Sequence, residues 1–343
     1  MSRSGEPLAE RLPAEQPLAK KRPAAAVDLS VRLGRLELAN PLLTASGTFG
    51  YGLEFAHLVE LPRLGGLVTK GLSLEPIAGN PPPRICETRG GMLNSIGLQN
   101  IGVERFIHDV LPHLAAIDSR VIVNLFGTTI DEYVRLAERV DREAGIAAVE
   151  LNVSCPNVKR GGIHFGHDPK LLRELVAAVR AVTAKPLAVK LSPNVTSPAE
   201  LGHAAREGGA DILSAINTVV GMAIDARTRR PLLNTIRGGL SGPAIKPIAL
   251  RIVYDVARTV GLPVIGIGGI ETVDDVIEFL LAGASAVQIG TALFRDPRTP
   301  ERILAELGER LTADGVASIS ELIGALRIDD EPPSLGTPSE PRP

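Results

Sequence analysis

The sequence predicts an α/β protein, a (β/α)8 TIM barrel with an N-terminal hairpin and long insertions in its βα-loops. Short apolar runs with strand character occur at residues 41–45, 66–69, 121–125, 147–152, 187–191, 212–216, 264–267 and 286–289. Helical patterns with a 3.6-residue period separate most of them, at residues 133–142, 169–183, 198–207, 245–260, 273–282 and 300–311. Alternating strands and helices imply a parallel sheet, and eight strands favour closure into a barrel. An open doubly wound sheet is the alternative.

The barrel is expected to occupy residues 28–315. Residues 1–27 are rich in charges, prolines and alanines and are predicted to be a flexible leader. Period-2 apolar spacing over residues 28–38, with Gly34 at the turn, predicts a small hairpin. Residues 316–343 are interpreted as a C-terminal extension with a disordered, Pro- and Ser-rich tail from about residue 330.

Composition excludes several classes of protein. The 343 residues carry a formal net charge of -2, and aromatic residues make up 3%, which argues against binding to nucleic acid or to an anionic membrane. Two cysteines, Cys86 and Cys155, are too few for a disulfide scaffold or for an iron–sulfur cluster held by this chain alone. No signal peptide or membrane-spanning apolar run is recognised, so we expect a cytoplasmic protein.

Polar residues follow the predicted strands. Active sites of such barrels form where the strands end, at their carboxyl termini. The ends read Ser46-Gly47, Lys70-Gly71, Asn124, Asn152, Lys190, Asn217-Thr218, Gly268-Gly269 and Gly290-Thr291. Two lysines and three asparagines that converge on one rim predict a binding site for a polar ligand.

The run from residue 151 to 157, LNVSCPN, is the most reactive stretch of the chain. Pro156 cannot continue a central strand, so a loop is expected to carry Ser154, Cys155 and Asn157 outward. Amides can hydrogen-bond a planar polar ligand, and a thiol can move a proton or attack. The alternative is that Cys155 is a small buried hydrophobe and the asparagines form a turn.

The last two strand ends predict a phosphate site. Gly268-Gly269 and Gly290-Thr291 each precede a helical turn, and loops after strands 7 and 8 are the usual phosphate site of a barrel. Ser241-Gly242 could add another backbone donor. No G-x-G-x-x-G motif follows the first strand, so a dinucleotide fold is not expected, and no clustered ligands for a metal are found.

Two connections are too long to be simple loops, from residue 71 to about 102 and from 219 to 242. Long insertions on barrel loops are usually functional. The stretch 92–100, MLNSIGLQN, mixes amides with small and apolar residues, and it is interpreted as a lid or platform against a ligand or, alternatively, as a rigid surface loop.

Taken together, these motifs resemble the class 1 dihydroorotate dehydrogenases over roughly residues 28–312. The resemblance rests on residues 152–157 and 94–100, on Thr69-Lys70-Gly71 and Ile216-Asn217-Thr218, and on the glycine loops. Residues 45–50 and the loop around Pro81, Pro82 and Arg84 look most like the class 1B branch. That branch implies a homodimer core with an electron-transfer subunit that carries FAD and a [2Fe–2S] cluster, a heterotetramer that passes electrons to NAD.

The resemblance also implies roles for single residues. Cys155 matches the catalytic base, and Lys190 would stabilise negative charge on reduced flavin. The residues that match FMN contacts are Ser46, Lys70, Gly71, Asn124, Asn152, Lys190, Ile216, Gly242, Gly268, Gly269, Gly290 and Thr291. Those that match pyrimidine contacts are Lys70, Asn94, Ser95, Ile96, Gly97, Leu98, Asn152, Asn157, Asn217 and Thr218.

In this reading dihydroorotate is oxidised to orotate in de novo pyrimidine (UMP) biosynthesis: Cys155 takes the proton from C5, and the hydride from C6 goes to FMN N5. Four alternatives stay open at this point. They are a fumarate-dependent class 1A enzyme, a dihydropyrimidine dehydrogenase-like flavin barrel, a phosphate-binding barrel isomerase or synthase without flavin, and a non-catalytic subunit.

Overall fold

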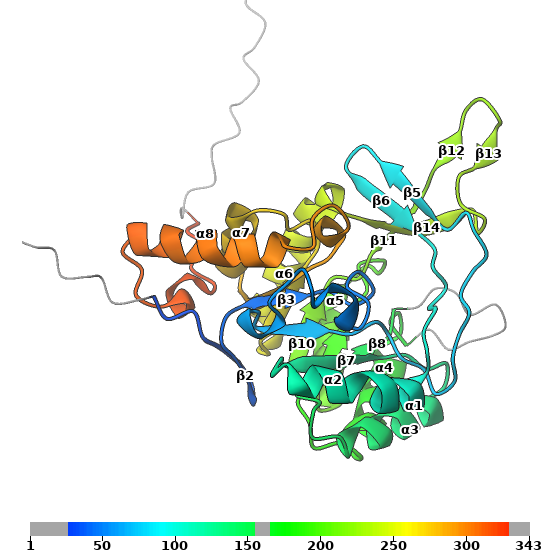
Figure 1. Ribbon diagram of the computed structural model, residues 1–343, viewed down its shortest axis with the longest axis horizontal. Helices are drawn as coiled ribbons and strands as arrows, with labels where there is room; N and C mark the ends of the chain where they lie inside the picture. The colour runs from blue at the N-terminus through cyan, green and yellow to red at the C-terminus, as the bar shows by residue number, and fades with distance from the viewer. Residues whose placement is uncertain (1–26, 155–164, 329–343) are drawn as a thin grey trace, which may run out of the picture.

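A closed barrel of eight parallel strands forms the centre of the molecule in the computed structural model, which describes residues 27–154 and 165–328 (Figure 1). The strand order around the barrel is β10-β15-β16-β3-β4-β7-β8-β9. The strands are β3 (Leu42–Thr44), β4 (Gly66–Val68), β7 (Val121–Leu125), β8 (Ala148–Asn152), β9 (Leu187–Lys190), β10 (Ile212–Ala215), β15 (Val264–Ile267) and β16 (Ala284–Ile289). All eight strand predictions are confirmed, and closure excludes the open doubly wound sheet.

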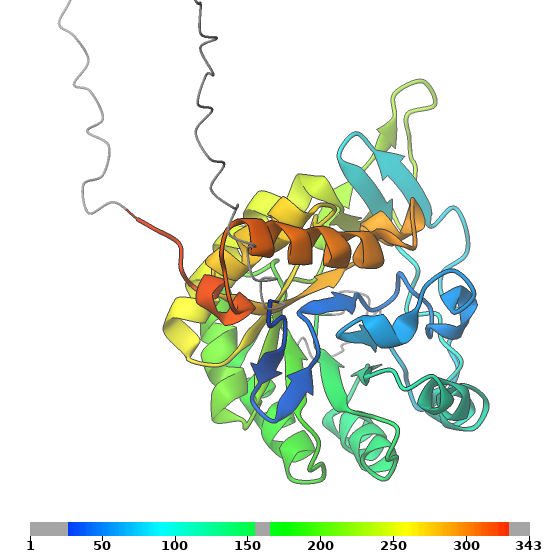
Figure 2. The same ribbon diagram turned by 60° about the vertical axis from the view of Figure 1, so that its left-hand side comes forward.

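Helices cover the outside of the strands, as Figure 2 shows. The six predicted helices are present within a few residues of their expected ends, as α3 (Ile130–Asp141), α4 (Pro169–Arg180), α5 (Pro198–Glu207), α6 (Lys246–Val260), α7 (Val273–Leu281) and α8 (Thr299–Ala313). Two of these helices begin with an N-cap residue followed by proline. Asp168 caps α4 and Ser197 caps α5 by accepting backbone N–H groups, each with proline in the first turn.

One long helical segment was not predicted. Residues 103–116 form α1 (Val103–Arg105), a π-helical stretch η3 (Phe106–Val110) and α2 (Leu111–Ala116) without a break. Pro112 in the middle of this segment indicates a helix breaker when the sequence is read alone. In the structure the π-helical turn ends just before it, so Pro112 falls in the first turn of α2, where its missing N–H is tolerated.

The predicted N-terminal hairpin is present as β1 (Val31–Leu33) and β2 (Leu36–Leu38), with Gly34 at a positive φ of 61°. Arg35 in its turn lies 3.7 Å from Asp211, which directly precedes β10. The hairpin therefore covers the amino-terminal end of the barrel. The 3-10 turn η6 (Ile319–Leu322) follows α8 and lies beside the start of the hairpin, because the backbone N–H of Ile319 donates to the carbonyl of Asp28 at 2.9 Å.

The two long insertions fold together, which was not predicted. β5 (Ile85–Thr88) and β6 (Gly91–Asn94) come from the first insertion, and β11 (Val219–Met222) and β14 (Arg237–Ser241) come from the second. They form one antiparallel sheet in the order β11-β14-β6-β5, which we call the cap sheet. It stands at one end of the molecule together with the hairpin of β12 (Ile224–Asp225) and β13 (Arg230–Pro231) (Figure 1).

Candidate active site

A cavity of about 700 Å³ opens at the carboxyl ends of the barrel strands, beside the cap sheet. Every predicted binding residue that the structure describes lines it. These residues are Ser46, Lys70, Gly71, Asn94, Ser95, Ile96, Gly97, Leu98, Asn124, Asn152, Lys190, Ile216, Asn217, Thr218, Gly242, Gly268, Gly269, Gly290 and Thr291. Cys155 and Asn157 lie outside the described residues. Ser154, which directly precedes Cys155, lines the cavity and donates a hydrogen bond to the carbonyl of Lys190 at 3.2 Å.

Three glycine-rich loops meet at one end of the cavity. Gly269 has a φ of +76°, and a Cβ there would lie 2.8 Å from Cβ of Lys246 and 2.9 Å from the carbonyl oxygen of Gly242. Only glycine allows the loops after β14 and β15 to approach so closely. The Thr291 hydroxyl, after β16, donates to Oγ of Ser241 at 2.8 Å and joins the third loop to the same place.

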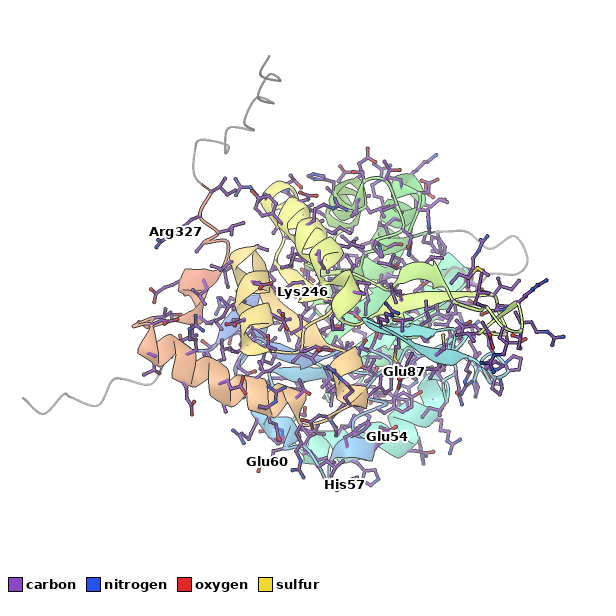
Figure 3. The ribbon with its side chains drawn as sticks, turned by 90° about the horizontal axis from the view of Figure 1, so that it is seen from above. Glu54, His57, Glu60, Glu87, Lys246 and Arg327 are labelled. Atoms are coloured by element: carbon purple, nitrogen blue, oxygen red, sulfur yellow. The ribbon has the colours of Figure 1, made fainter. Side chains whose placement is uncertain are left out.

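Ion pairs between α6 and α7 stabilise the helices that follow two of these loops. Lys246 at the start of α6, labelled in Figure 3, forms ion pairs of 2.6 Å with Asp275 and 2.8 Å with Glu278. Asp275 also accepts from the backbone N–H groups of Glu271 and Thr272 at the start of α7. Lys246 is therefore engaged by carboxylates and joins α6 to α7, so it is not available to an anion in the cavity.

Two lysines supply positive charge to the cavity. Lys190 is 5% exposed, and its Nζ lies 3.3 Å from Oγ of Ser46. Burial lowers the pKa of Lys70, and the nearby guanidinium of Arg84 lowers it further. No ion pair joins either lysine to a carboxylate of residues 27–154 or 165–328, so both charges remain available to an anionic ligand.

A chain of amides fixes the polarity of one wall. The backbone N–H of Thr218 donates to Oδ1 of Asn217 at 2.8 Å, and Nδ2 of Asn217 donates to Oδ1 of Asn152 at 3.1 Å. The Tyr133 hydroxyl donates to the main-chain carbonyl of Asn152 at 2.8 Å. With both side-chain oxygens engaged, Asn152 and Asn217 present N–H donors to the cavity.

At Asn124 on β7 the side-chain nitrogen is engaged and the side-chain oxygen is not, the reverse of Asn152 and Asn217. Its Nδ2 donates to Oε1 of Glu150 at 2.8 Å, and its Oδ1 is buried without a hydrogen-bond partner. A Cβ at Gly71 would lie 2.8 Å from this oxygen. Asn124, which lines the cavity, therefore holds a buried acceptor without a partner, beside a glycine that has no side chain to contact it.

The cap sheet supplies the remaining wall. β6 pairs with β14 so that Asn94 lies opposite Gly239, and residues 94–99 line the cavity. Asn100 fixes the end of this segment, because its Oδ1 accepts from the backbone N–H groups of Ser73 and Gly102. The platform interpretation of this stretch thus agrees with its position, although its strands were not expected.

Sequence reasoning missed two residues that organise the site. Glu150 was treated only as part of the apolar run 147–152, although a lone carboxylate inside such a run is itself a signal. Asn194 follows β9, donates to the carbonyl of Thr218 at 3.0 Å and accepts from the N–H of Val220 at 2.9 Å. It connects the amide wall to the cap sheet, and no local pattern marked it.

Two further observations concern the described residues alone. In residues 27–154 and 165–328, no three His, Cys, Asp or Glu side chains are grouped so that they could hold a metal ion. Among the described helices, none combines the length and apolar character that crossing a membrane requires.

Comparison with known proteins agrees with this site. The family model for dihydroorotate dehydrogenase matches residues 28–311. Several relatives carry the name "Dihydroorotate dehydrogenase B (NAD(+)), catalytic subunit". The protein from Geobacter metallireducens is 56% identical over 90% of this chain and 100% of its own length. The protein from Geobacter sulfurreducens is 57% identical over 88% of this chain and 99% of its own length. A namesake from Trichlorobacter lovleyi is 57% identical over 87% of this chain and 98% of its own.

A solved structure supports the fold independently. The crystal structure of dihydroorotate dehydrogenase from Eimeria tenella in complex with ferulenol superposes with a TM-score of 0.72 at 24% identity, covering 87% of this chain and 88% of that one. At that identity the likeness concerns the fold alone. On the family model and the bacterial relatives together, the chain belongs to the dihydroorotate dehydrogenase family.

Proposed function

We propose that this chain is the catalytic subunit of an NAD-linked dihydroorotate dehydrogenase, which oxidises dihydroorotate to orotate in pyrimidine biosynthesis. The observation that carries the proposal is one cavity that combines glycine loops, two lysines and a wall of amides in a member of this family. The relatives' name specifies NAD and a catalytic subunit. This chain is 54–57% identical to these relatives over nearly their whole length. We expect the enzyme to act in the cytoplasm.

The residues of the cavity fit FMN. A phosphate needs several N–H donors at close range, and the loops at Gly242, Gly268-Gly269 and Gly290-Thr291 meet where a side chain would intrude. The unpartnered Oδ1 of Asn124 suits an N–H on the ring, and Lys190 suits a group that gains negative charge. When bound, FMN supplies the two-electron acceptor for the reaction.

The substrate end requires a proton acceptor and groups that hold a carboxylate and carbonyls. We assign the carboxylate to Lys70 and the carbonyls to the N–H donors of Asn152 and Asn217, because these groups point donors into the cavity. We assign the proton on C5 to Cys155, which as a thiolate would accept it, and we assign Asn157 to a pyrimidine contact. The electrons of the reaction would then pass to a partner subunit.

The proposed partner is a subunit with FAD and a [2Fe–2S] cluster, in a heterotetramer around a homodimer of this chain. The words "catalytic subunit" in the relatives' name support a separate partner. The fumarate-dependent class 1A alternative is not favoured, because the bacterial relatives described above carry the NAD-linked name. Family membership likewise disfavours a barrel isomerase without flavin.

An absorbance spectrum of the purified chain tests the proposal, followed by anaerobic addition of dihydroorotate. We expect bands at about 370 and 450 nm, as for oxidised flavins in general, and we expect the substrate to bleach them. Bands that persist after addition would remove dihydroorotate as the substrate. A colourless protein that takes up no added FMN would overturn the flavin assignment. Reduction of fumarate by the isolated chain would favour class 1A.

A further inference from the structure

A carboxylate lies inside the barrel, below the cavity. Glu150 on β8 is 0% exposed and accepts three hydrogen bonds, all from uncharged groups on other strands. Its Oε1 accepts from Nδ2 of Asn124 on β7 at 2.8 Å. Its Oε2 accepts from the hydroxyl of Ser214 on β10 at 2.7 Å and from Nε2 of Gln288 on β16 at 2.8 Å.

Stability alone does not explain this carboxylate. Burying a charge without a cationic partner is costly, and an apolar side chain of similar volume fills a barrel interior at least as well. The hydrogen bonds do, however, have a directional effect. An amide has one donor end and one acceptor end, so a carboxylate that engages Nδ2 of Asn124 turns its Oδ1 the other way.

That oxygen is the unsatisfied acceptor of the cavity. Oδ1 of Asn124 is buried and has no partner, and Gly71 beside it has no side chain that could cover it. The donors at Asn152 and Asn217 show that the amides of this site are oriented individually, each by its own neighbours. At Asn124 the neighbour that determines the orientation is Glu150.

We propose that Glu150 is a positioning residue, which locks the Asn124 amide so that its oxygen accepts a hydrogen bond from the ring N–H of bound flavin. The inference rests on the proposed function, since it requires FMN in the cavity. Oxidised flavin has a single ring N–H, at N3. The Glu150–Asn124 pair therefore selects a flavin that is unsubstituted at this position and fixes which edge of the ring faces β7.

Replacement by glutamine tests the orientation without changing the shape. In Glu150→Gln the new oxygen still accepts from Ser214 and Gln288, which leaves its NH2 facing Nδ2 of Asn124. Two donors cannot pair, so Asn124 turns and presents N–H to the cavity. We expect apoprotein of this variant to bind FMN at least tenfold more weakly than wild type, measured by quenching of flavin fluorescence.

The double variant Glu150→Gln with Asn124→Asp is the rescue. It exchanges acid and amide, so the hydrogen bond between the two positions is rebuilt in reverse and an oxygen again faces the cavity. We expect it to regain most of the lost FMN affinity. Ser214→Ala is the matched control, because it removes another hydrogen bond of the same carboxylate and leaves the Asn124 contact; we expect its FMN affinity to stay within about twofold of wild type.

Titration with 3-methyl-FMN provides a second readout. Wild type and the rescue variant should discriminate against this analogue, and Glu150→Gln should discriminate much less. Unchanged affinity and discrimination in Glu150→Gln, or an equal loss in Ser214→Ala, would overturn the inference. If Glu150→Gln does not fold, the rescue variant decides, since a rescue variant that accepts both flavins equally contradicts the assignment. A wild-type protein that binds no FMN would instead defeat the proposed function.

Discussion

The barrel and the cap sheet form the two sides of one cavity, yet they are built differently. The barrel strands are buried along almost their whole length, as in β7 and β9. In the cap sheet exposed and partly buried residues alternate, as in β5 and β11. Parallel strands covered by helices have no solvent-facing side, whereas an antiparallel sheet can face water on one side.

The two regions also differ in what holds them together. Leu43 on β3 is 0% exposed and belongs to the continuous apolar core of the barrel. Leu93 on β6 is 2% exposed but lies outside that core, and Gly221 of β11 packs beside it. The barrel thus provides a rigid frame for the glycine loops and lysines, and the cap sheet is a local unit placed over them. The predictions below test this division.

The largest effect is expected at the two cysteines, Cys155, which follows β8 in the sequence, and Cys86 in the cap sheet. Cys155→Ala should keep FMN but lower turnover by about 10²–10⁴-fold, because a general base contributes on that scale. Cys86→Ala, in β5 of the cap sheet, should retain turnover. Anaerobic flavin reduction by dihydroorotate measures both. Equal losses, or loss of flavin from Cys155→Ala, would contradict the assignment of Cys155 as the base.

A smaller loss is expected at Lys190, whose Nζ approaches Ser46 at the rim of the barrel. Lys190→Ala should slow flavin reduction by about 10²–10³-fold, because a fixed charge at a site of developing charge has an effect of this size. Rapid-mixing absorbance at the flavin band measures the rate, and Lys185→Ala, two residues before the start of β9, is the matched control. Normal reduction in Lys190→Ala would remove its electrostatic role.

Truncation of one buried leucine in each region compares how much the barrel and the cap sheet contribute to global stability. Leu43→Ala should lower the free energy of unfolding by about 2–5 kcal/mol, as for a leucine in a continuous core. Leu93→Ala should lower it less, while raising KM for dihydroorotate, because its neighbours in β6 line the cavity. Chemical denaturation and steady-state kinetics provide the two readouts. If Leu93→Ala cost as much global stability as Leu43→Ala, the cap sheet would not be a separate unit.

The smallest effect concerns pH. Burial and Arg84 lower the pKa of Lys70, so in the folded protein its proton is lost at lower pH than from an ordinary lysine. Orotate binding should weaken as pH rises through this lowered pKa, because only the protonated amine pairs with a carboxylate. Arg84→Gln removes a positive neighbour and should move the midpoint to higher pH. Arg89→Gln, an exposed arginine of the same hairpin, should not move it.

The same pKa has a consequence for folding. A lysine that holds its proton less tightly when folded destabilises the protein while it is charged. Below the folded pKa both states are protonated and the cost is complete. As pH rises from the folded towards the unfolded pKa, the unfolded chain binds more protons and this cost is relieved. Lys70→Met should therefore flatten the alkaline part of the stability profile.

The barrel could be predicted from the sequence because its strands are local apolar runs, and the residues at their ends follow from topology alone. The cap sheet could not, because Asn94 and Gly239 pair across 145 residues and their strands lack an apolar run. Glu150 was missed for a related reason. Its partners lie on three other strands, so nothing beside it in the sequence indicates that its charge is satisfied.

The meeting of Asp28 with residues 317–319 has a practical consequence for engineering. Asp28 donates to the carbonyl of Ala317 at 3.0 Å, and the neighbouring hairpin closes the amino-terminal end of the barrel. Asp28, near the start of the folded core, and the turn η6, near its end, thus lie side by side at the end of the barrel opposite the cavity. An enzyme tethered to a support through either end would keep the opening of its cavity turned towards the solution. The same closeness makes the chain a good candidate for circular permutation, with a short linker between the old ends.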